Sequence, residues 1–240
     1  AGWSDDKNTL PKMAALLRMA TEPGTAARSL TLTSNGRCLI YADGARGNGV
    51  EAAMSLAGAL KDSLGVTVMI TNAGNDIMAN GDSGLLTRGT IRRASGHFTA
   101  FDLTIDGFAS AAPSSRSFVA FDEPQDGVES DCDLIIDITG GTPLFTGWEK
   151  RDGYFRADAE DSLRLKSLAA EAAEMIGDFE KPIYVDYNAD LCAHSRNSLT
   201  GCSRCLDVCP AGAITPAGDT VAIDTAICGG CGYCGAVCPS

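Results

Sequence analysis

Residues 228–239 read Cys-Gly-Gly-Cys-Gly-Tyr-Cys-Gly-Ala-Val-Cys-Pro, which spaces four cysteines as C-x2-C-x2-C-x3-C and ends the run with a proline. Part of the same pattern occurs upstream, where Cys202, Cys205 and Cys209 are followed by Pro210. Cys192 precedes this second group, and nine residues separate it from Cys202. Eight of the ten cysteines of the chain therefore lie in its last fifty residues.

This spacing is typical of the loop that binds a [4Fe–4S] cluster, in which each of four irons takes one thiolate from the protein. Three cysteines on a tight loop surround one side of the cluster, so the fourth must come from elsewhere. In chains with two such motifs, the cysteine before proline binds the other cluster. This rule predicts one cluster bound by Cys228, Cys231, Cys234 and Cys209, and a second bound by Cys192, Cys202, Cys205 and Cys238.

An internal repeat supports the assignment of Cys192. The pair Val185-Asp186 leads to Cys192 much as Ile223-Asp224 leads to Cys228, with an aliphatic residue before each cysteine. Residues 193–201 are then an insertion after the first cysteine. They include His194, which we interpret as a surface or supporting imidazole rather than an iron ligand like the histidines of Rieske centres. A first cluster that lacks one iron is a further alternative.

Glycines crowd the second motif at positions 229, 230, 232 and 235. Glycine lets the backbone approach a cluster closely and adopt left-handed conformations. We therefore expect backbone amides of this loop to point at sulfur, which is one way in which proteins set a reduction potential.

Residues 182–240 resemble a bacterial dicluster ferredoxin module. The resemblance implies two βαβ-like halves related by pseudo-twofold symmetry, two [4Fe–4S] clusters, and electron transfer to or from a larger redox enzyme. A zinc ribbon is a weaker interpretation, because it leaves Cys209, Cys234 and Cys238 without a role. A disulfide scaffold is weaker still, because such scaffolds belong to small secreted chains with poor cores.

The composition limits the kinds of partner that the protein is expected to bind. The 240 residues are 45% hydrophobic and carry a net charge of −12, which is typical of a globular protein. Nucleic acid is not expected as a partner, since binding phosphates requires basic patches. No apolar stretch is long enough to span a membrane, and cluster thiolates need reducing conditions, so we expect a cytoplasmic protein. The chain lacks an initiator Met, so we expect it to be a piece of a longer polypeptide. Its expected partner is a redox protein or the remaining domains of that longer chain.

Residues 1–181 are expected to form an α/β domain with a mixed sheet, and residues 182–240 a small α+β ferredoxin-like domain. Apolar strands are predicted over 37–41, 66–71 and 134–138, with a further strand over 118–121. A hairpin is predicted to turn at 95–97, and helices over 48–64 and 158–176. A short amphipathic helix over 13–20 is expected to pack on the main body.

Three Gly-rich loops follow predicted strands, at 44–49, 72–75 and 140–143. Gly47 and Gly49 belong to a G-x-G-x-x-A sequence between a strand and a helix, where backbone amides could bind a phosphate. The motif is short and the acid expected after the next strand is replaced by Asn72. A nucleotide or flavin is therefore the less favoured expectation, and tight structural turns the more favoured one.

No catalytic constellation emerges, and the two other cysteines, Cys38 and Cys132, are interpreted as buried, unreactive thiols. The leading hypothesis is an electron carrier rather than a catalyst. One alternative is a fragment of an oxidoreductase whose first domain binds a nucleotide or flavin. Another is a structural or regulatory protein in which the clusters only stabilise the C-terminal module and carry no electrons.

Overall fold

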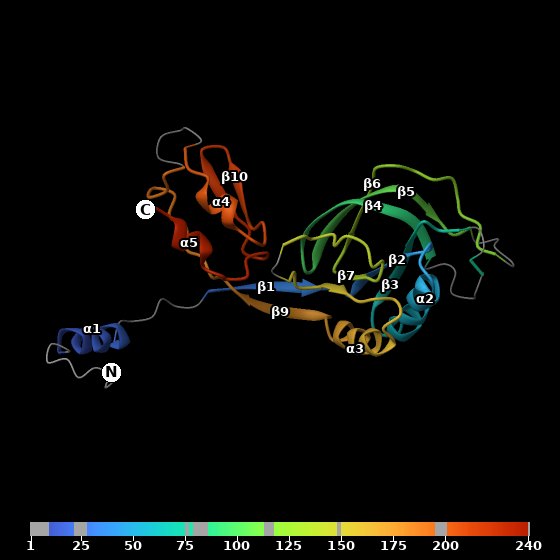
Figure 1. The fold of residues 1–240 in the computed structure, drawn as a ribbon, viewed down its shortest axis with the longest axis horizontal. Coiled ribbons are helices and arrows are strands. Elements are labelled where there is room, and N and C mark those ends of the chain that lie inside the picture. Colours follow the sequence, from blue (N-terminus) through green and yellow to red (C-terminus); the bar gives the residue numbers. More distant parts are fainter. Residues whose placement is uncertain are drawn as a thin grey trace.

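The computed structural model describes residues 10–21, 28–74, 77–78, 86–112, 118–147, 150–194 and 201–239. An α/β domain and a small cysteine-rich region lie at opposite ends of a two-stranded ribbon (Figure 1). The described residues do not include Asp76, Trp148, Glu149 or residues 195–200 of the insertion after Cys192.

The α/β domain is built on one seven-stranded sheet with the order β6-β5-β4-β3-β2-β7-β8. Its strands are β2 (Arg37–Asp43), β3 (Gly65–Thr71), β4 (Leu86–His97), β5 (Ala100–Ser110), β6 (Val128–Cys132), β7 (Leu134–Asp137) and β8 (Tyr154–Arg156). The pairs from β4 through β3, β2 and β7 to β8 are parallel, whereas β4–β5 and β5–β6 are antiparallel. The predicted α/β domain with a mixed sheet is therefore confirmed.

Two helices, α2 (Gly49–Leu60) and α3 (Ser162–Ala173), cover one face of this sheet (Figure 1). Residues of both helices share a hydrophobic core with the central strands, for example Leu56 of α2 with Ile40 of β2. The opposite face has a second core, in which Leu39 and Phe101 are buried. The central strands are thus buried on both faces, which explains why they are continuous apolar runs in the sequence.

The sheet curls strongly, and a single residue shows why it must. Only Asp133 lies between β6 and β7, although the sheet order places five strand spacings between them. In a flat sheet that separation would be about 24 Å, whereas one residue spans roughly 3.5 Å. Curling brings the end of β6 back to β2, so that Asp133 N donates to Arg37 O at 2.8 Å.

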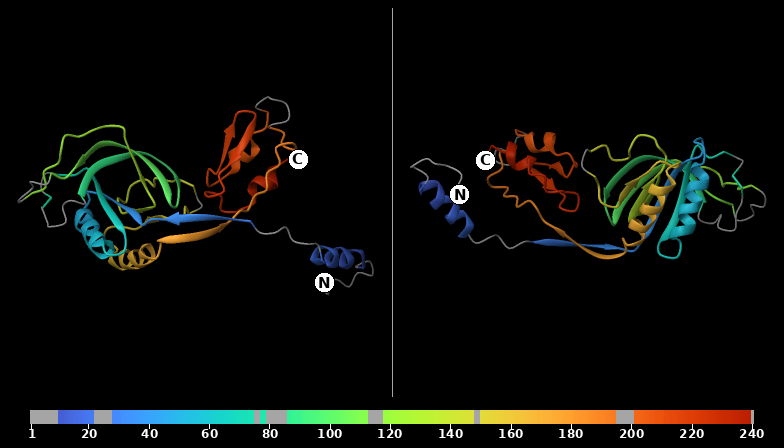
Figure 2. Two further views of the ribbon diagram at one scale, coloured as in Figure 1. Left: turned by 180° about the vertical axis from the view of Figure 1, so that it is seen from behind. Right: turned by 60° about the horizontal axis from the view of Figure 1, so that its bottom comes forward.

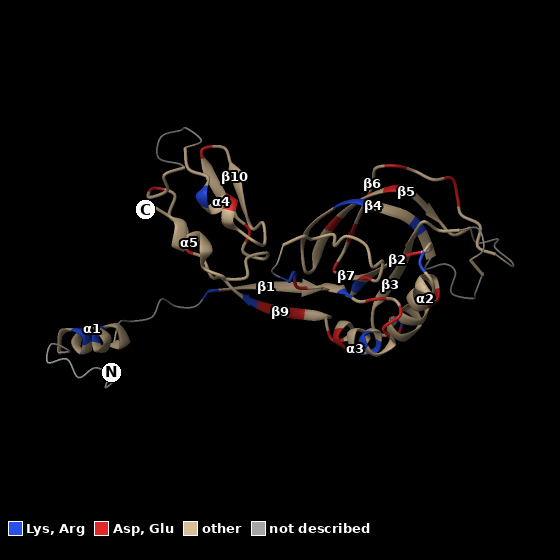
Figure 3. Ribbon diagram, in the orientation of Figure 1, with Lys and Arg blue, Asp and Glu red and all other residues tan. Residues whose placement is uncertain are grey.

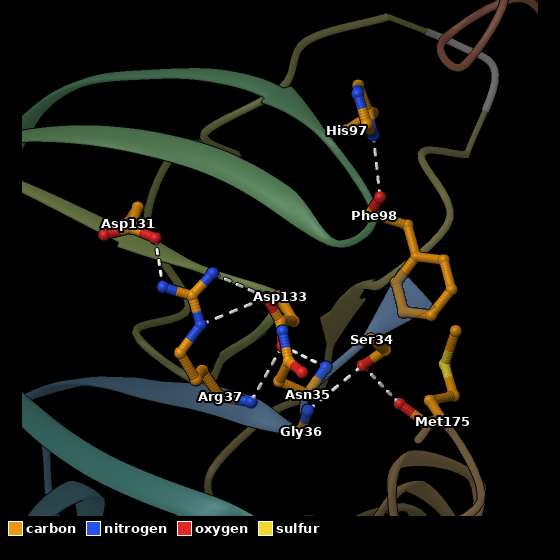
Figure 4. Close-up of polar contacts among 9 residues, drawn as sticks. All are labelled: Ser34, Asn35, Gly36, Arg37, His97, Phe98, Asp131, Asp133 and Met175. Atoms are coloured by element: carbon orange, nitrogen blue, oxygen red, sulfur yellow. Dashed lines mark hydrogen bonds and ion pairs between the residues drawn. The ribbon is translucent and has the colours of Figure 1, made fainter. Parts of the chain in front are cut away.

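Figure 4 shows how the side chain of Asp133 stabilises this junction. Its carboxylate is fully buried and accepts from the backbone amides of Asn35 (2.7 Å) and Arg37 (3.1 Å). The Arg37 guanidinium donates to it through Nε (3.2 Å) and Nη2 (2.8 Å), and also contacts Asp131. The hydrogen bonds to these carboxylates raise the pKa of Arg37, that from Asp133 most strongly.

The ribbon between the two parts was not predicted. It pairs β1 (Ser29–Ser34) with β9 (Gly177–Pro182) in antiparallel register, and Figure 2 shows both strands running together from the sheet toward the cysteine-rich region. Thr31 donates to Glu180 at 2.6 Å and Thr33 to Asp178 at 2.7 Å across it. Polar pairs of this kind leave no apolar run for sequence patterns to detect.

The predicted N-terminal helix forms as α1 (Leu10–Thr21), but it does not pack on the main body. None of its residues is buried, and it lies well away from the sheet in both views of Figure 2. Its apolar side chains, such as Leu17 and Met19, are exposed. The expectation of packing was wrong because amphipathic periodicity predicts a helix but does not specify what covers its apolar face.

Two further expectations are corrected. The hairpin of β4 and β5 forms, but His97 pairs with Ala100, so the turn lies at Phe98 and Thr99 instead of 95–97. Thr99 adopts a φ of 79° there. Phe118 and Phe121 form only isolated bridges, with Met78 and Ala111, and residues 118–121 form no strand.

The cysteine-rich region contains two short helices and a hairpin: α4 (Arg204–Val208), β10 (Ile214–Ala217), β11 (Thr220–Ile223) and α5 (Tyr233–Val237). The hairpin is antiparallel, and the two helices pack on each other. In the part of the chain that the structure describes, no helix is long and apolar enough to cross a membrane.

Candidate metal centre

The two helices of the cysteine-rich region position equivalent cysteines. Each helix has five residues and is followed by a cysteine in extended conformation, Cys209 after α4 and Cys238 after α5. Their backbone angles are similar, with φ, ψ of −72°, 108° and −66°, 127°. The two Cys-Pro steps of the sequence therefore have the same local structure.

The second motif surrounds a cavity together with a cysteine from the first. Cys228, Cys231 and Cys234 line a cavity of about 60 Å³, and Cys209 of the first motif also lines it. Apolar residues close it, among them Val185, Ile214 and Ile223. The structure thus brings together the four cysteines that the sequence assigns to one cluster.

Backbone amides point at the sulfurs of this cavity. Ala213 N donates to Cys209 Sγ at 3.3 Å. Burial raises the pKa of the Cys228 thiol, and neighbouring thiols add to this, while a hydrogen bond from the Gly230 amide opposes it. Gly230 and Gly232 have φ of 77° and 78°, conformations in which a side chain would be strained. The glycines of the loop are therefore required for its path around the cavity.

The first motif brings together Cys192, Cys202 and Cys205. Burial raises the pKa of Cys205, and the electrostatic influence of the neighbouring Cys192 and Cys202 thiols adds to the rise. Each motif thus contains a partly buried thiol with a raised pKa, Cys205 in the first and Cys228 in the second. Iron binding must therefore displace the protons of these thiols.

The turns that lead into the two motifs are also similar. The residues that correspond between them, however, are not the pair that the sequence repeat aligns. Asp224 accepts from Ala226 N at 2.9 Å, four residues before Cys228. The residue in the same place before Cys192 is Asn188, whose side chain accepts from Asp190 N at 3.0 Å. Asp186, which the sequence repeat aligns with Asp224, instead pairs with Arg28 at 3.1 Å.

His194 is not a surface residue, so that part of its interpretation was wrong. Its side chain is 1% exposed, and Nδ1 lies 2.8 Å from the carbonyl oxygen of Cys202. The sequence does not predict this burial, because a lone histidine in a loop has no apolar periodicity around it.

The cysteines fit an iron–sulfur cluster. None of the ten cysteines forms a disulfide among the described residues, and the eight in this region are at least partly exposed, whereas Cys38 and Cys132 are buried as expected. Among the described residues, no three His, Cys, Asp or Glu side chains are drawn together around a single ion. The thiols of the second motif instead surround a space lined with amides and apolar groups, which suits a larger group with sulfur ligands.

Comparison with known proteins agrees with this geometry. Residues 200–240 match the family model of the 4Fe-4S dicluster domain. The chain is also similar to the isethionate sulfite-lyase activating enzyme of Oleidesulfovibrio alaskensis, with 45% identity over 60 residues. That similarity covers 24% of this chain and 18% of the enzyme. No solved structure shows a significant match to the chain. The C-terminal region is thus a dicluster domain, and its eight cysteines imply two [4Fe–4S] clusters.

The predicted phosphate loop lies where expected, between β2 and α2, at the carboxyl edge of the parallel strands. Gly49 is required by packing, since a Cβ there would lie 2.5 Å from the backbone oxygen of Asp43. The loop is flanked by carboxylates: Glu51 lies in the first turn of α2, and Glu160 approaches Gly47. This arrangement has the shape of a phosphate loop, but its charge disfavours an anion.

A groove of about 870 Å³ separates the α/β domain from the dicluster domain. Tyr184 and Gly229 line both this groove and the cavity of the second motif. The two domains meet beside it, where Arg151 donates to the Gly96 carbonyl of the sheet and, at 2.7 Å, to the Ala211 carbonyl beside Cys209 and Pro210. No pattern in the sequence predicts these contacts of Arg151.

Proposed function

We propose that this protein is an electron-transfer protein in which the dicluster domain carries the electrons. The observation that supports it best is the cavity that joins Cys209 to the three cysteines of the second motif. When bound, [4Fe–4S] clusters exchange single electrons. The chain's own residues hold the thiolates in place, direct the Ala213 and Gly230 amides at sulfur, and exclude water with apolar side chains.

For the second motif we propose Cys228, Cys231, Cys234 and Cys209 as the ligands. For the first motif we propose Cys202, Cys205 and Cys238, with a fourth ligand from the segment that starts at Cys192. Cys238 is included because it occupies the position after α5 that Cys209 occupies after α4.

The partner is proposed to be a redox protein or a further part of the same polypeptide. Acidic residues occur in both domains (Figure 3), and the net charge is −12. Complementary charge accelerates docking and is weakened by salt. A basic partner face is therefore favoured, and the rate of electron exchange with it is expected to fall as ionic strength rises.

The test is to prepare the protein without oxygen and measure iron and acid-labile sulfide. About eight of each per chain are expected from two clusters, with brown absorption that dithionite bleaches and an EPR signal in the reduced state. Cys228→Ser should lower the iron to about four, whereas Cys38→Ala, at a buried thiol in the α/β domain, should leave it at about eight. Zinc in place of iron, or clusters that dithionite fails to reduce, would contradict the proposal.

A second candidate function is favoured by the groove. Its volume lies within the usual range for cofactor sites, aromatic side chains such as Phe145 and Phe179 line it, and Tyr184 separates it from the second motif. An oxidoreductase fragment that binds a flavin here would place it beside the cluster ligands. Flavin mononucleotide should then bind the intact protein, and Tyr184→Ala should weaken binding at least about tenfold. The control is Phe118→Ala, an exposed aromatic outside the groove. Absence of binding removes this candidate and leaves the electron-transfer proposal intact.

A further inference from the structure

His194 holds a buried ring nitrogen that lacks a partner. Among the residues that the structure describes, its Nε2 is the one buried side-chain nitrogen or oxygen without a hydrogen bond. Leaving such an atom unsatisfied costs about 1–3 kcal/mol, and native structures contain few of them. An atom of this kind in a metal-binding domain calls for a ligand that protein side chains do not provide.

The other ring nitrogen shows which form the imidazole takes. Nδ1 lies 2.8 Å from the Cys202 carbonyl oxygen, which can only accept a hydrogen bond, so Nδ1 carries the proton. A neutral imidazole with its proton on Nδ1 has a lone pair on Nε2. Histidines that bind metals commonly donate their other N–H to a carbonyl or carboxylate in this way, which orients the ring and increases its basicity.

The location points to the first motif. His194 follows Cys192 by two residues, and its hydrogen bond ends on the backbone of Cys202, one of the ligands proposed for the first cluster. Cys192 and His194 therefore compete for the one ligand position that Cys202, Cys205 and Cys238 leave open. The sequence repeat favours Cys192, as does the proximity of its thiol to that of Cys205, whereas the unsatisfied nitrogen favours His194.

The cost of leaving each side chain without iron decides between them. A thiol behaves as a small apolar group and a weak hydrogen-bond donor, so it is readily accommodated without a metal. A buried imidazole nitrogen has no such option. We propose that Nε2 of His194 binds iron in the first cluster, at the position that the repeat assigns to Cys192. This inference rests on the proposed function, since it requires that the first cluster be present.

The consequence is a difference between the two clusters. A neutral imidazole in place of a thiolate leaves the first centre with one negative charge fewer, and histidine ligands raise the potential in Rieske centres. The first cluster then has the higher potential, and electrons entering at the second motif pass toward the first.

The test is EPR and ENDOR spectroscopy of the reduced protein, residues 1–240, prepared without oxygen and labelled with ¹⁵N-histidine. The chain has only two histidines, His97 and His194. Strong nitrogen coupling to one cluster is expected, and it should disappear in His194→Gln and persist in His97→Gln. His194→Cys should restore a thiolate and lower the potential of that centre, a change that a purely structural role would not produce.

The outcomes separate the two proposals. If the protein lacks iron and sulfide, the proposed function fails. If both clusters are present without nitrogen coupling, only the role of His194 is overturned. The same holds if Cys192→Ser loses the first cluster while His194→Gln keeps both centres with unchanged potentials.

Discussion

Asp133 is the single side chain on which the curl of the sheet depends most. It is fully buried, and its carboxylate satisfies two backbone amides and the Arg37 guanidinium (Figure 4). A buried carboxylate is tolerated only when it is paired and hydrogen-bonded. Here the carboxylate binds the start of β2 to the residue that joins β6 to β7.

Asp133→Ala should lower the free energy of unfolding by about 3–5 kcal/mol, because it leaves the Arg37 charge and two amides without their acceptor. Chemical denaturation followed by circular dichroism measures the loss. The matched control is Asp131→Ala, which removes the other, exposed partner of Arg37 and should cost at most about 1 kcal/mol. Equal losses for the two variants would show that burial of Asp133 contributes nothing.

The two buried thiols of the α/β domain should make its stability depend on alkaline pH. Burial raises the pKa of Cys38 from 9.0 to about 12 and raises that of Cys132 as well. In the unfolded chain both thiols ionise from about pH 9 upward. Because only the unfolded state releases these protons, stability is unaffected below pH 9 and falls as pH rises toward 12.

Each thiol should contribute a slope of about 1.4 kcal/mol per pH unit in this window. Replacing Cys38 and Cys132 together by Ala should therefore flatten the dependence of unfolding free energy on pH between 9 and 11. Denaturant titrations of the wild type and the double variant at several pH values measure the difference. Parallel curves would contradict the effect of burial on these thiols.

At the scale of elements, α2 shows that two glycines in one helix have opposite roles. Gly49 begins the helix against the end of β2, where a Cβ would lie 2.5 Å from the Asp43 oxygen. Gly58 lies inside the same helix, and a Cβ there would meet nothing within 4 Å. The first is required by close packing, and the second only adds conformational freedom to the unfolded chain.

Gly49→Ala should therefore destabilise the protein by about 1–3 kcal/mol, because a backbone oxygen cannot move away cheaply. Gly58→Ala should stabilise it by about 0.5–1 kcal/mol. Thermal unfolding of the two variants under identical conditions measures both the expected loss of stability and the expected gain. A higher stability of Gly49→Ala would mean that the backbone at the end of β2 can move away from the added Cβ at little cost, contrary to its close packing.

The ribbon of β1 and β9 is the element that sets the geometry of the molecule. It connects the sheet to the dicluster domain, and its strands come from opposite ends of the α/β domain's sequence. Residues 1–181 therefore do not end in an independent linker, because the last strand before residue 182 pairs with the first strand of the domain. The boundary proposed at residue 181 lies at the end of this pairing.

At the scale of the whole molecule, Arg151 is the contact that couples the two domains. Its guanidinium bridges the Gly96 and Ala211 carbonyls and stacks on Phe145 at 4.5 Å. Burial lowers its pKa, and Gly147 lies so close to Pro210 that a Cβ would clash with its oxygen. The interface thus lies directly beside the Cys209 side of the second motif.

Arg151→Ala should release the dicluster domain from this position, because it removes two charge-assisted hydrogen bonds worth about 1.5–3 kcal/mol each. Small-angle X-ray scattering of the iron-loaded protein should then show a larger radius of gyration. Arg92→Ala, at an exposed arginine that pairs only weakly with Asp106 at 3.5 Å, should leave the scattering unchanged. An unchanged curve for Arg151→Ala would mean that the ribbon alone positions the domain.

Sequence alone determined the features that depend on local spacing. The interval between Cys228, Cys231 and Cys234 predicts a cluster loop because three thiolates on one short turn are constrained by the covalent chain itself. The apolar runs of β2, β3 and β7 likewise predict buried parallel strands, since each run must be covered on both faces. The strands β1, β8 and β9 contain no long continuous apolar run, so they were not found in this way.

Tertiary structure alone decided which distant groups meet. It placed Cys209 at the cavity of the second motif, buried His194 with one nitrogen unsatisfied, and left α1 away from the body. Burial depends on segments far apart in the chain, and their approach is governed by the curl of the sheet and the path of the ribbon. No periodicity or spacing in the sequence predicts which segments approach each other, because that depends on the packing of the whole molecule and not on any one segment.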